Sequence, residues 1–255
     1  MKKYELTAEF IEKWGKKLFR IKALISFGSV EVGELGGYVE KEDNLAQDDN
    51  AWVHGNARVF GNARVCGNAR VCDDAEVLGN ARVFGNARVC DDAEVHGNAR
   101  VFGNARVCDD AEVCGNARVC DDAEVLGNAR VFGNARVCDD AEVCDDAEVF
   151  GNARVYGDAR VCGNARVYGD ADYLLIGRIG SRFSFTTFFK NKDKGITVSC
   201  GCFLGTIAEF RAKVSDTHGN NKHAKIYNLA ADMAELQILG EEHFENLNTN
   251  KSEPF

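Results

Sequence analysis

Two cysteines and two histidines near the C-terminus have the residue types of a zinc site. One residue separates Cys200 from Cys202, and four separate His218 from His223. The histidine spacing falls within the range of zinc sites, but the cysteines are closer together than the usual C-x2–4-C. The alternative is two cysteines on opposite faces of a strand and two histidines at helix ends. Zinc is therefore one candidate ligand, and for the chain as a whole we expect no cofactor.

Six arginines offer a second chemistry, the binding of anions. They recur at equal intervals along the chain, so any backbone with that period would bring them into one row. Such a row could hold a small anion or a nucleotide, or it could be a row of solvated side chains. The candidate binding residues are Arg64, Arg82, Arg100, Arg118, Arg136 and Arg154.

The backbone that positions these arginines is a six-residue repeat, G-N-A-R-V-x alternating with D-D-A-E-V-x. Alanine occupies every sixth position from Ala51 through Ala171, which makes 21 hexads, and valine follows two residues later. Within A-R-V-x the side chains alternate as in a strand, with Ala and Val on one face. The G-N or D-D pair supplies residues that tolerate a bent or left-handed backbone. Each hexad therefore predicts a short strand and a corner.

Three such hexads, or eighteen amino acids, close a triangle, and stacked triangles form a parallel β-solenoid. The acidic hexads support this length, because at three hexads per coil they fall into two columns while the third column is entirely G-N. We therefore predict a mainly β fold, with about seven coils at roughly 4.8 Å each and a length of about 34 Å. The acidic hexads begin at Asp73, Asp91, Asp109, Asp121, Asp139 and Asp145.

The repeat resembles the hexapeptide-repeat family, whose pattern is aliphatic-x-x-x-small-x. The resemblance implies a left-handed parallel β-helix, a fold that serves acyltransferases, carbonic anhydrases and non-enzymatic scaffolds. The segments Phe19–Glu40 and Asn44–Val53 look like the first coils of a bacterial and bacteriophage group that is described as polymer-forming or uncharacterised. That group brings no catalytic residues to carry over, so the resemblance implies an origin and leaves the mechanism open.

The histidines of the repeat argue against catalysis. Hexapeptide acyltransferases use a histidine at a subunit interface and often a projecting loop, but here only His54 and His96 lie in the repeat and no hexad is interrupted. A zinc site of the carbonic anhydrase kind needs several histidines, and these two fall in different columns. Nearly identical hexads also work against one special constellation. We therefore expect no enzyme, with an acyltransferase as the remaining enzymatic alternative.

The variable sixth residue of each hexad makes apolar ladders outside the solenoid. Contiguous apolar surface often marks an interface, although arginine stems can also cover such rings. Because one face is basic and another mostly acidic, two copies could pair these faces, and a heterologous contact closes as a trimer or continues as a filament. Calcium at the Asp corners is a further alternative to a solvated corner. The candidate interface residues are Phe84, Phe102, Phe132, Phe150, Tyr156 and Tyr168.

The chain divides into a cap (1–50), the solenoid (51–172), a C-terminal module (173–240) and a polar tail expected to be flexible (241–255). In the cap, Thr7 can N-cap a short helix that places Phe10 and Leu18 on one face. A cap is needed because the first coil of a solenoid exposes its core and an unpaired edge.

For the C-terminal module, the sequence predicts two strands followed by two helices, a ββαα arrangement. Strands are expected at Phe183–Lys190 and Ile196–Cys202, joined by N-K-D-K-G. A capping box at Thr206 opens a helix that runs to about Thr217. A second helix follows from about Lys222 to Leu239.

Composition limits the location and the partners. The net charge of −9 is spread over both signs, which argues against nucleic acid. No segment approaches the ~18 apolar residues of a membrane span, and the first ten residues do not predict a signal peptide. Of the eleven cysteines, nine occupy the variable slot, which we interpret as small apolar residues in a reducing, cytoplasmic setting. We therefore predict a non-enzymatic solenoid scaffold that self-associates or binds a protein partner, with capture of an anion or nucleotide as the alternative.

Overall fold

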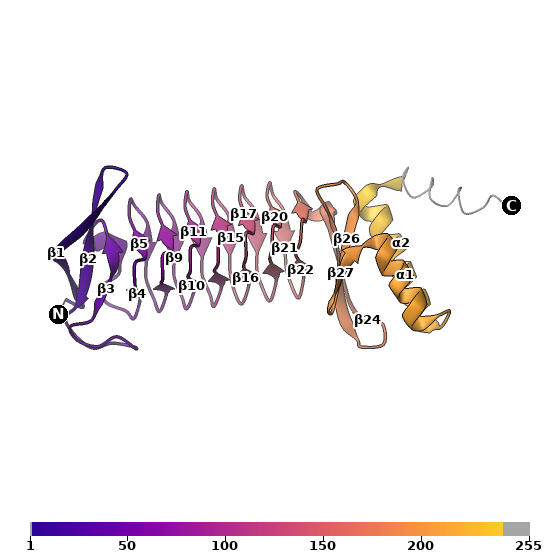
Figure 1. Ribbon diagram of the computed structural model, residues 1–255, viewed down its shortest axis with the longest axis horizontal. Coiled ribbons are helices and arrows are strands. Elements are labelled where there is room, and N and C mark those ends of the chain that lie inside the picture. Colours follow the sequence, from indigo (N-terminus) through magenta and orange to yellow (C-terminus); the bar gives the residue numbers. More distant parts are fainter. Residues whose placement is uncertain (1, 242–255) are drawn as a thin grey trace.

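The computed structural model describes residues 2–241 and shows a rod of stacked coils between two caps (Figure 1). Twenty two-residue strands, β4 to β23, build the rod, and each pairs in parallel with the strand one coil away. The predicted β-solenoid of about seven coils is confirmed, while the left hand implied by the resemblance stays a prediction. The strands are Trp52–Val53, Arg58–Val59, Arg64–Val65, Arg70–Val71, Glu76–Val77, Arg82–Val83, Arg88–Val89, Glu94–Val95, Arg100–Val101, Arg106–Val107, Glu112–Val113, Arg118–Val119, Glu124–Val125, Arg130–Val131, Arg136–Val137, Glu142–Val143, Glu148–Val149, Arg154–Val155, Arg160–Val161 and Arg166–Val167.

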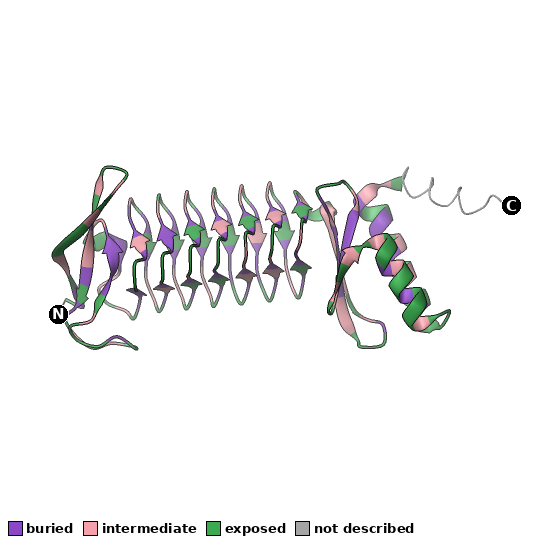
Figure 2. Cartoon of the chain, in the orientation of Figure 1, coloured by how far each residue is buried: buried purple, intermediate pink, exposed green. Residues whose placement is uncertain are grey.

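The register of the coils is three hexads, as the acidic columns predict. Arg100 pairs with Arg82 on one side and Arg118 on the other. The three resulting sheets are named here by their outward residues. The Arg face is β6-β9-β12-β15-β18-β21, the Glu face is β5-β8-β11-β14-β17-β20-β23, and the Cys face is β4-β7-β10-β13-β16-β19-β22. Every Ala and Val of these hexads is buried in one core, while the outward positions are mostly exposed or half-buried (Figure 2).

The corners explain why G-N and D-D alternate. Gly97 has a φ of 69° and Asp91 a φ of 58°, so both residues adopt the left-handed conformation at the same step of the hexad. Glycine adopts this conformation without a steric cost, and Asp is among the few other residues that tolerate it. The Asp side chain adds a bond between coils, because Asp109 accepts a hydrogen bond from the backbone N–H of Gly127 at 2.9 Å.

The N-terminal cap is a hairpin, so the helix predicted from Thr7 is wrong. Strands β1 (Tyr4–Lys13) and β2 (Lys16–Ala23) pair antiparallel around a tight turn at Trp14 and Gly15. β3 (Leu35–Val39) then joins β2 to the Glu face through β5. The open edge of the first coil favours strand pairing over an isolated helical turn, because the edge supplies backbone partners at once.

The hairpin closes the near end of the core. Tyr4, Ile21 and Trp52 are at most 1% exposed, and the ring of Trp52 lies 6.1 Å from that of Tyr4. A short 3-10 helix, η1 (Glu42–Asn44), precedes the first regular coil. Gly36 is required where β3 crosses the core, because a Cβ there would lie 2.5 Å from the carbonyl oxygen of Val53.

The C-terminal module closes the far end with four strands, where two were predicted. After η2 (Asp170–Asp172), the antiparallel sheet runs β24 (Tyr173–Ile179), β25 (Ser184–Lys190), β26 (Ile196–Cys200) and β27 (Phe203–Thr206). Phe189 on β25 is fully buried in the solenoid core, so the sheet covers the last coil. The two added strands flank the predicted pair at its edges.

Two helices pack on this sheet, as predicted. α1 (Ile207–His218) begins at Thr206, whose side chain accepts a hydrogen bond from the N–H of Glu209, so the capping box is confirmed. α2 (Lys222–Leu239) begins after Asn221. In the described part of the chain, neither helix is long and apolar enough to cross a membrane. The predicted flexible tail lies, except for residue 241, outside the described residues.

Candidate functional site

The six predicted binding arginines form one continuous row on the Arg face. Each is the first residue of its strand, and its neighbours lie directly above and below at the coil spacing. Within residues 2–241 none of the six makes an ion pair with a carboxylate. All are exposed except Arg136, which is half-buried. The Arg face is therefore a row of uncompensated positive charge.

A ladder of asparagine amides runs beside this row. The Nδ2 of Asn80 donates to the Oδ1 of Asn98 at 3.0 Å, and the same bond is repeated between successive coils from Asn62 to Asn152. A groove along the first coils is lined by this ladder and the neighbouring arginines. Its lining residues are Lys41, Asp43, Asn62, Ala63, Arg64, Asn80, Arg82, Asn98 and Arg100.

On the Glu face, by contrast, the charges are compensated within the chain. Arg130 donates to Glu112 at 2.8 Å, and Arg166 lies 3.1 Å from Glu148, each across one coil. The Cys face has the same kind of pair in Arg106 and Glu124 at 2.9 Å. Most glutamates of the Glu face are thus neutralised by arginines of neighbouring coils, whereas in the Asp corner beside it only Asp74 makes an ion pair among the described residues.

A short acidic stripe remains on the Glu face and its corner. Asp92, Glu94 and Asp110 line one shallow hollow with the paired Glu112. In the described part of the chain none of the three makes an ion pair. We call these three residues the acidic stripe.

Four of the six predicted interface aromatics lie in stacked pairs, and five of the six are only half-buried. Phe84 stacks on Phe102 on the Arg face, with ring centroids 5.0 Å apart. Phe132 and Phe150 stack in the same way on the Glu face, where the guanidinium of Arg130 lies 5.5 Å from the ring of Phe132. These four rings and Tyr156 are half-buried, and Tyr168 alone of the six is well exposed, at 62%.

Six of the nine repeat cysteines form disulfides, so our interpretation of them as unpaired apolar residues is wrong. The bonds join adjacent coils: Cys90–Cys108 and Cys144–Cys162 on the Cys face, and Cys120–Cys138 on the Arg face. Stacking places the Cα atoms 4.6 to 4.7 Å apart, within the range that disulfides accept. The signal was present in the sequence as cysteines three hexads apart. Their pairing could not be assigned without the redox state.

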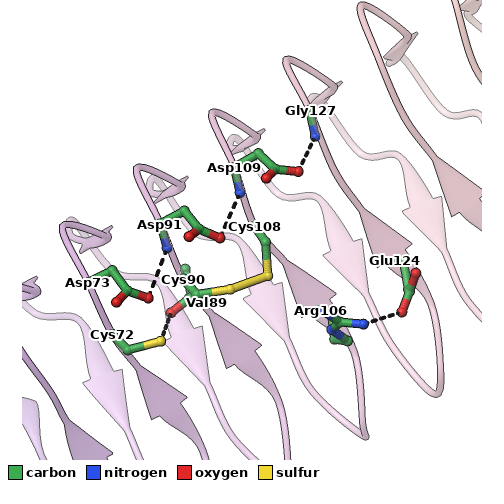
Figure 3. The surroundings of a disulfide bond; sticks show 10 residues. All are labelled: Cys72, Asp73, Val89, Cys90, Asp91, Arg106, Cys108, Asp109, Glu124 and Gly127. Atoms are coloured by element: carbon green, nitrogen blue, oxygen red, sulfur yellow. Dashed lines mark hydrogen bonds and ion pairs between the residues drawn. A yellow bond between two sulfur atoms is a disulfide. The ribbon is translucent and has the colours of Figure 1, made fainter.

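Figure 3 shows the first of these bonds among the contacts that link the coils. Cys72 continues the same ladder as an unpaired thiol, and burial raises the pKa of this thiol to about 12. The cytoplasmic location stays a prediction.

The predicted zinc residues of the C-terminal module come only partly together. Cys200, Cys202 and His218 line one shallow pocket with Tyr227, and the rings of His218 and His223 lie 5.9 Å apart. Thr186 donates a hydrogen bond to the Cys200 sulfur at 3.2 Å. Burial raises the pKa of Tyr227 to about 12, with Cys200 nearby as a second cause.

Other possible metal ligands lie closer together than the predicted zinc residues do. Among residues 2–241, four groups of three possible ligand side chains have their donor atoms within 4.8 Å of one another, and none of the four includes a predicted zinc residue. One is His96, Glu112 and Cys114 on the Glu face, where His96 Nε2 lies 2.9 Å from Glu112 Oε1. Burial raises the pKa of the Cys114 thiol to about 11. The sequence signal was that His96 and Cys114 are three hexads apart.

Comparison with known families identifies a solenoid repeat. A family model described as the YdcK beta solenoid repeat matches residues 147–163 and 159–171, which lie at the end of the rod. No curated protein matches the chain. The match and the coiled architecture together support a β-solenoid repeat protein, and the bacterial or phage origin stays a prediction.

Proposed function

We propose that this β-solenoid is a non-enzymatic scaffold that self-associates side by side. The Arg face of one copy would lie against the acidic stripe of the next. The observation that carries the proposal is the row of six arginines without carboxylate partners in the described chain, whereas on the other two faces most strand arginines and glutamates pair with one another across one coil. Like charges about 4.8 Å apart repel one another, so an acidic surface would stabilise this row.

The spacing of the charges favours a second copy as that surface. Coils repeat at 4.7 Å, as the Cα separation of Cys90 and Cys108 gives it. Another copy repeats at the same interval, so Asp92 and Asp110, on successive coils, can face two successive arginines in one register. Phe84 and Phe102 lie beside the arginines and add stacked apolar area, and aromatic side chains flanked by arginine are enriched at interface cores. Because the two surfaces differ, the contact is heterologous and gives a trimer or a filament.

Charge reversal tests this contact from both sides. Light scattering should give a multimer of the wild type at low salt and a smaller species at high salt, because charged contacts are screened. R100E/R118E and D92K/D110K should each lower the mass at low salt. Mixing the two variants should raise the mass above that of either alone, since the reversed Arg face of one complements the reversed stripe of the other. Recovery should be complete for a filament and partial for a trimer, because three subunits in a ring cannot alternate between two variants. R70E/R88E is the matched control, because it makes the same charge change on the Cys face.

Two results would oppose the proposal. One is a monomer at every salt concentration, and the other is an assembly that ignores both face variants. A third result would favour the alternative function, the capture of a small anion on the Arg face. In that case R100E/R118E would leave the mass unchanged but abolish the binding of pyrophosphate measured by calorimetry. Saturable binding of acetyl-CoA would instead revive the acyltransferase alternative.

A further inference from the structure

His96 and Cys114 are departures from the repeat that meet in space. Both occupy the variable slot of the Glu face ladder, where the neighbouring coils carry Leu78 and Phe132. Glu112 belongs to the same hexad as Cys114, two residues earlier. The ring nitrogen, the carboxylate oxygen and the thiol sulfur all lie within 4.8 Å of one another. One imidazole, one carboxylate and one thiol therefore converge at a single point on an otherwise repetitive rod.

The backbone holds these three side chains in place. Strand β11, which precedes His96, pairs in register with β14, which carries Glu112. The N–H of His96 donates to the carbonyl of Val113 at 3.0 Å, and the N–H of Cys114 donates to Val131 at 2.9 Å. Sites on regular strands are held more precisely than sites on loops, so the ligand atoms are preorganised.

From this geometry we propose that His96 Nε2, Glu112 Oε1 and Cys114 Sγ bind a divalent transition metal of the Zn²⁺ class. All three are zinc ligands, with bonds of about 2.0–2.2 Å to nitrogen and oxygen and about 2.3 Å to sulfur, and the Cys114 thiol releases its proton to solvent as the metal binds. In a tetrahedral site the nitrogen and oxygen would lie roughly 3.4 Å apart. The observed separation is 2.9 Å, so a small opening of the side chains admits the ion. Three protein ligands leave a fourth position for water or another ligand.

The second carboxylate oxygen strengthens the assignment. Arg130 Nε donates to Glu112 Oε2 at 2.8 Å, which fixes the plane of the carboxylate and leaves Oε1 directed at His96. Groups that orient a ligand in this way commonly support metal binding. The His96 and Glu112 side chains are 33% and 27% exposed, so an ion can reach them from solvent.

The other three clusters do not compete in this state of the protein. Each contains a disulfide pair: Cys90 with Cys108, Cys120 with Cys138, or Cys144 with Cys162. Thiolates are the metal ligands among cysteine sulfurs, and these sulfurs are already bonded to one another. The cluster at His96 is the only one of the four whose cysteine is free.

Cobalt is the probe, because a thiolate ligand gives Co²⁺ an intense sulfur-to-metal charge-transfer absorption. Purified full-length protein is titrated with Co²⁺ without reductant, so that the disulfides stay closed, and Zn²⁺ is then added to displace it. We expect one Co²⁺ per chain with thiolate absorption, and full displacement by Zn²⁺. C114S should abolish the absorption, and H96L should weaken binding by about tenfold or more.

These substitutions should leave the fold of the solenoid unchanged. Leucine already occupies the slot one coil before His96, at Leu78, and C66S is the control for an unpaired thiol in a variable slot on another face. C66S should bind cobalt as the wild type does. The proposal is overturned if the wild type shows no thiolate absorption with Co²⁺. It is also overturned if C114S keeps that absorption, or if H96L binds Co²⁺ as tightly as the wild type. Loss of the signal in C202S alone would move the site to the C-terminal module and would equally overturn it.

Discussion

The Arg face and the Glu face share one backbone and differ in how their outward charges are compensated. Both are parallel columns in the same three-hexad register, with valines of the same buried core behind them. On the Glu face, a change of sign between neighbouring coils lets Arg130 pair with Glu112. On the Arg face no such change occurs. The inward residues therefore specify the coil, and the charged outward residue of each hexad decides whether a face is internally compensated or open to a partner.

The largest expected difference in stability between the two faces comes from disulfides. The Arg face has one and the Glu face has none in the described residues. Cys120–Cys138 closes a loop across one full coil. Such a crosslink contributes about 3 kcal/mol to the free energy of unfolding in the chain-entropy description. C120S/C138S should therefore lower the melting temperature and raise hydrogen exchange in the coils from 118 to 138.

The control for this prediction is C66S, which removes an unpaired thiol from the same ladder and should melt as the wild type does. Peptide mapping of the oxidised protein should recover Cys120 and Cys138 in one linked fragment. Identical melting of C120S/C138S and wild type under oxidising conditions would contradict the stabilising role of the bond.

The backbone of the rod could be predicted from the sequence because its signals agree with one another. The Ala–Val period, the turn residues and the positions of Asp73 and Asp91 all specify three hexads per coil. The structure of the N-terminal cap was harder to predict from the sequence, because Thr7 and the apolar residues after it also fit a helix. Pairing with a neighbouring strand decided between the two structures, and such long-range pairing is not visible in a local pattern.

The candidate sites were only partly predictable for a related reason. The row containing Arg100 and Arg118 follows from the spacing alone, but its lack of partners depends on which carboxylates already bind elsewhere. The group at His96 and Cys114 was hidden because each residue by itself looked like a filler of the variable slot. Only stacking with Glu112, on the coil that follows His96, gives them a shared chemistry.

The corners offer a second test of the difference between the faces. Every corner before the Arg face is glycine, while Asp91 occupies the corresponding corner of the Glu face with a φ of 58°. At Gly115 an added Cβ would lie 2.9 Å from the N atom of Gly133. G115D should therefore cost about 1 kcal/mol, the lower end of the penalty for a side chain in this conformation, because Asp tolerates it better than most residues.

The reverse exchange, D91G, should change the melting temperature little. It relieves the left-handed backbone but loses the hydrogen bond from the N–H of Asp109 to Asp91, at 3.3 Å. Comparing the two melts measures the asymmetry directly. Equal destabilisation by G115D and D91G would show that the corners are interchangeable and that steric limits do not explain the all-glycine column.

The smallest expected effect is the change in stability when one arginine is replaced, and it should have opposite signs on the two faces. R130Q removes the ion pair with Glu112 and the contact with the Phe132 ring, and should cost about 0.5–1 kcal/mol. R118Q removes one positive charge from between Arg100 and Arg136, so it should be neutral or stabilising by a few tenths of a kcal/mol at low salt. Melting temperatures of both variants at low and high salt check this, at a concentration low enough to keep the protein monomeric.

Salt should shrink both effects, because ions at about 1 M screen charges beyond roughly 3 Å. Losses of similar size for R130Q and R118Q would mean that Arg118 has a stabilising contact of its own, and the Arg face would no longer be the uncompensated one. If the stability changes of R130Q and R118Q have opposite signs and both approach zero in high salt, the row of arginines destabilises the isolated chain by electrostatic repulsion. A cost of that kind is relieved by an acidic partner, and it gives the Arg face a reason to bind one that the Glu face lacks.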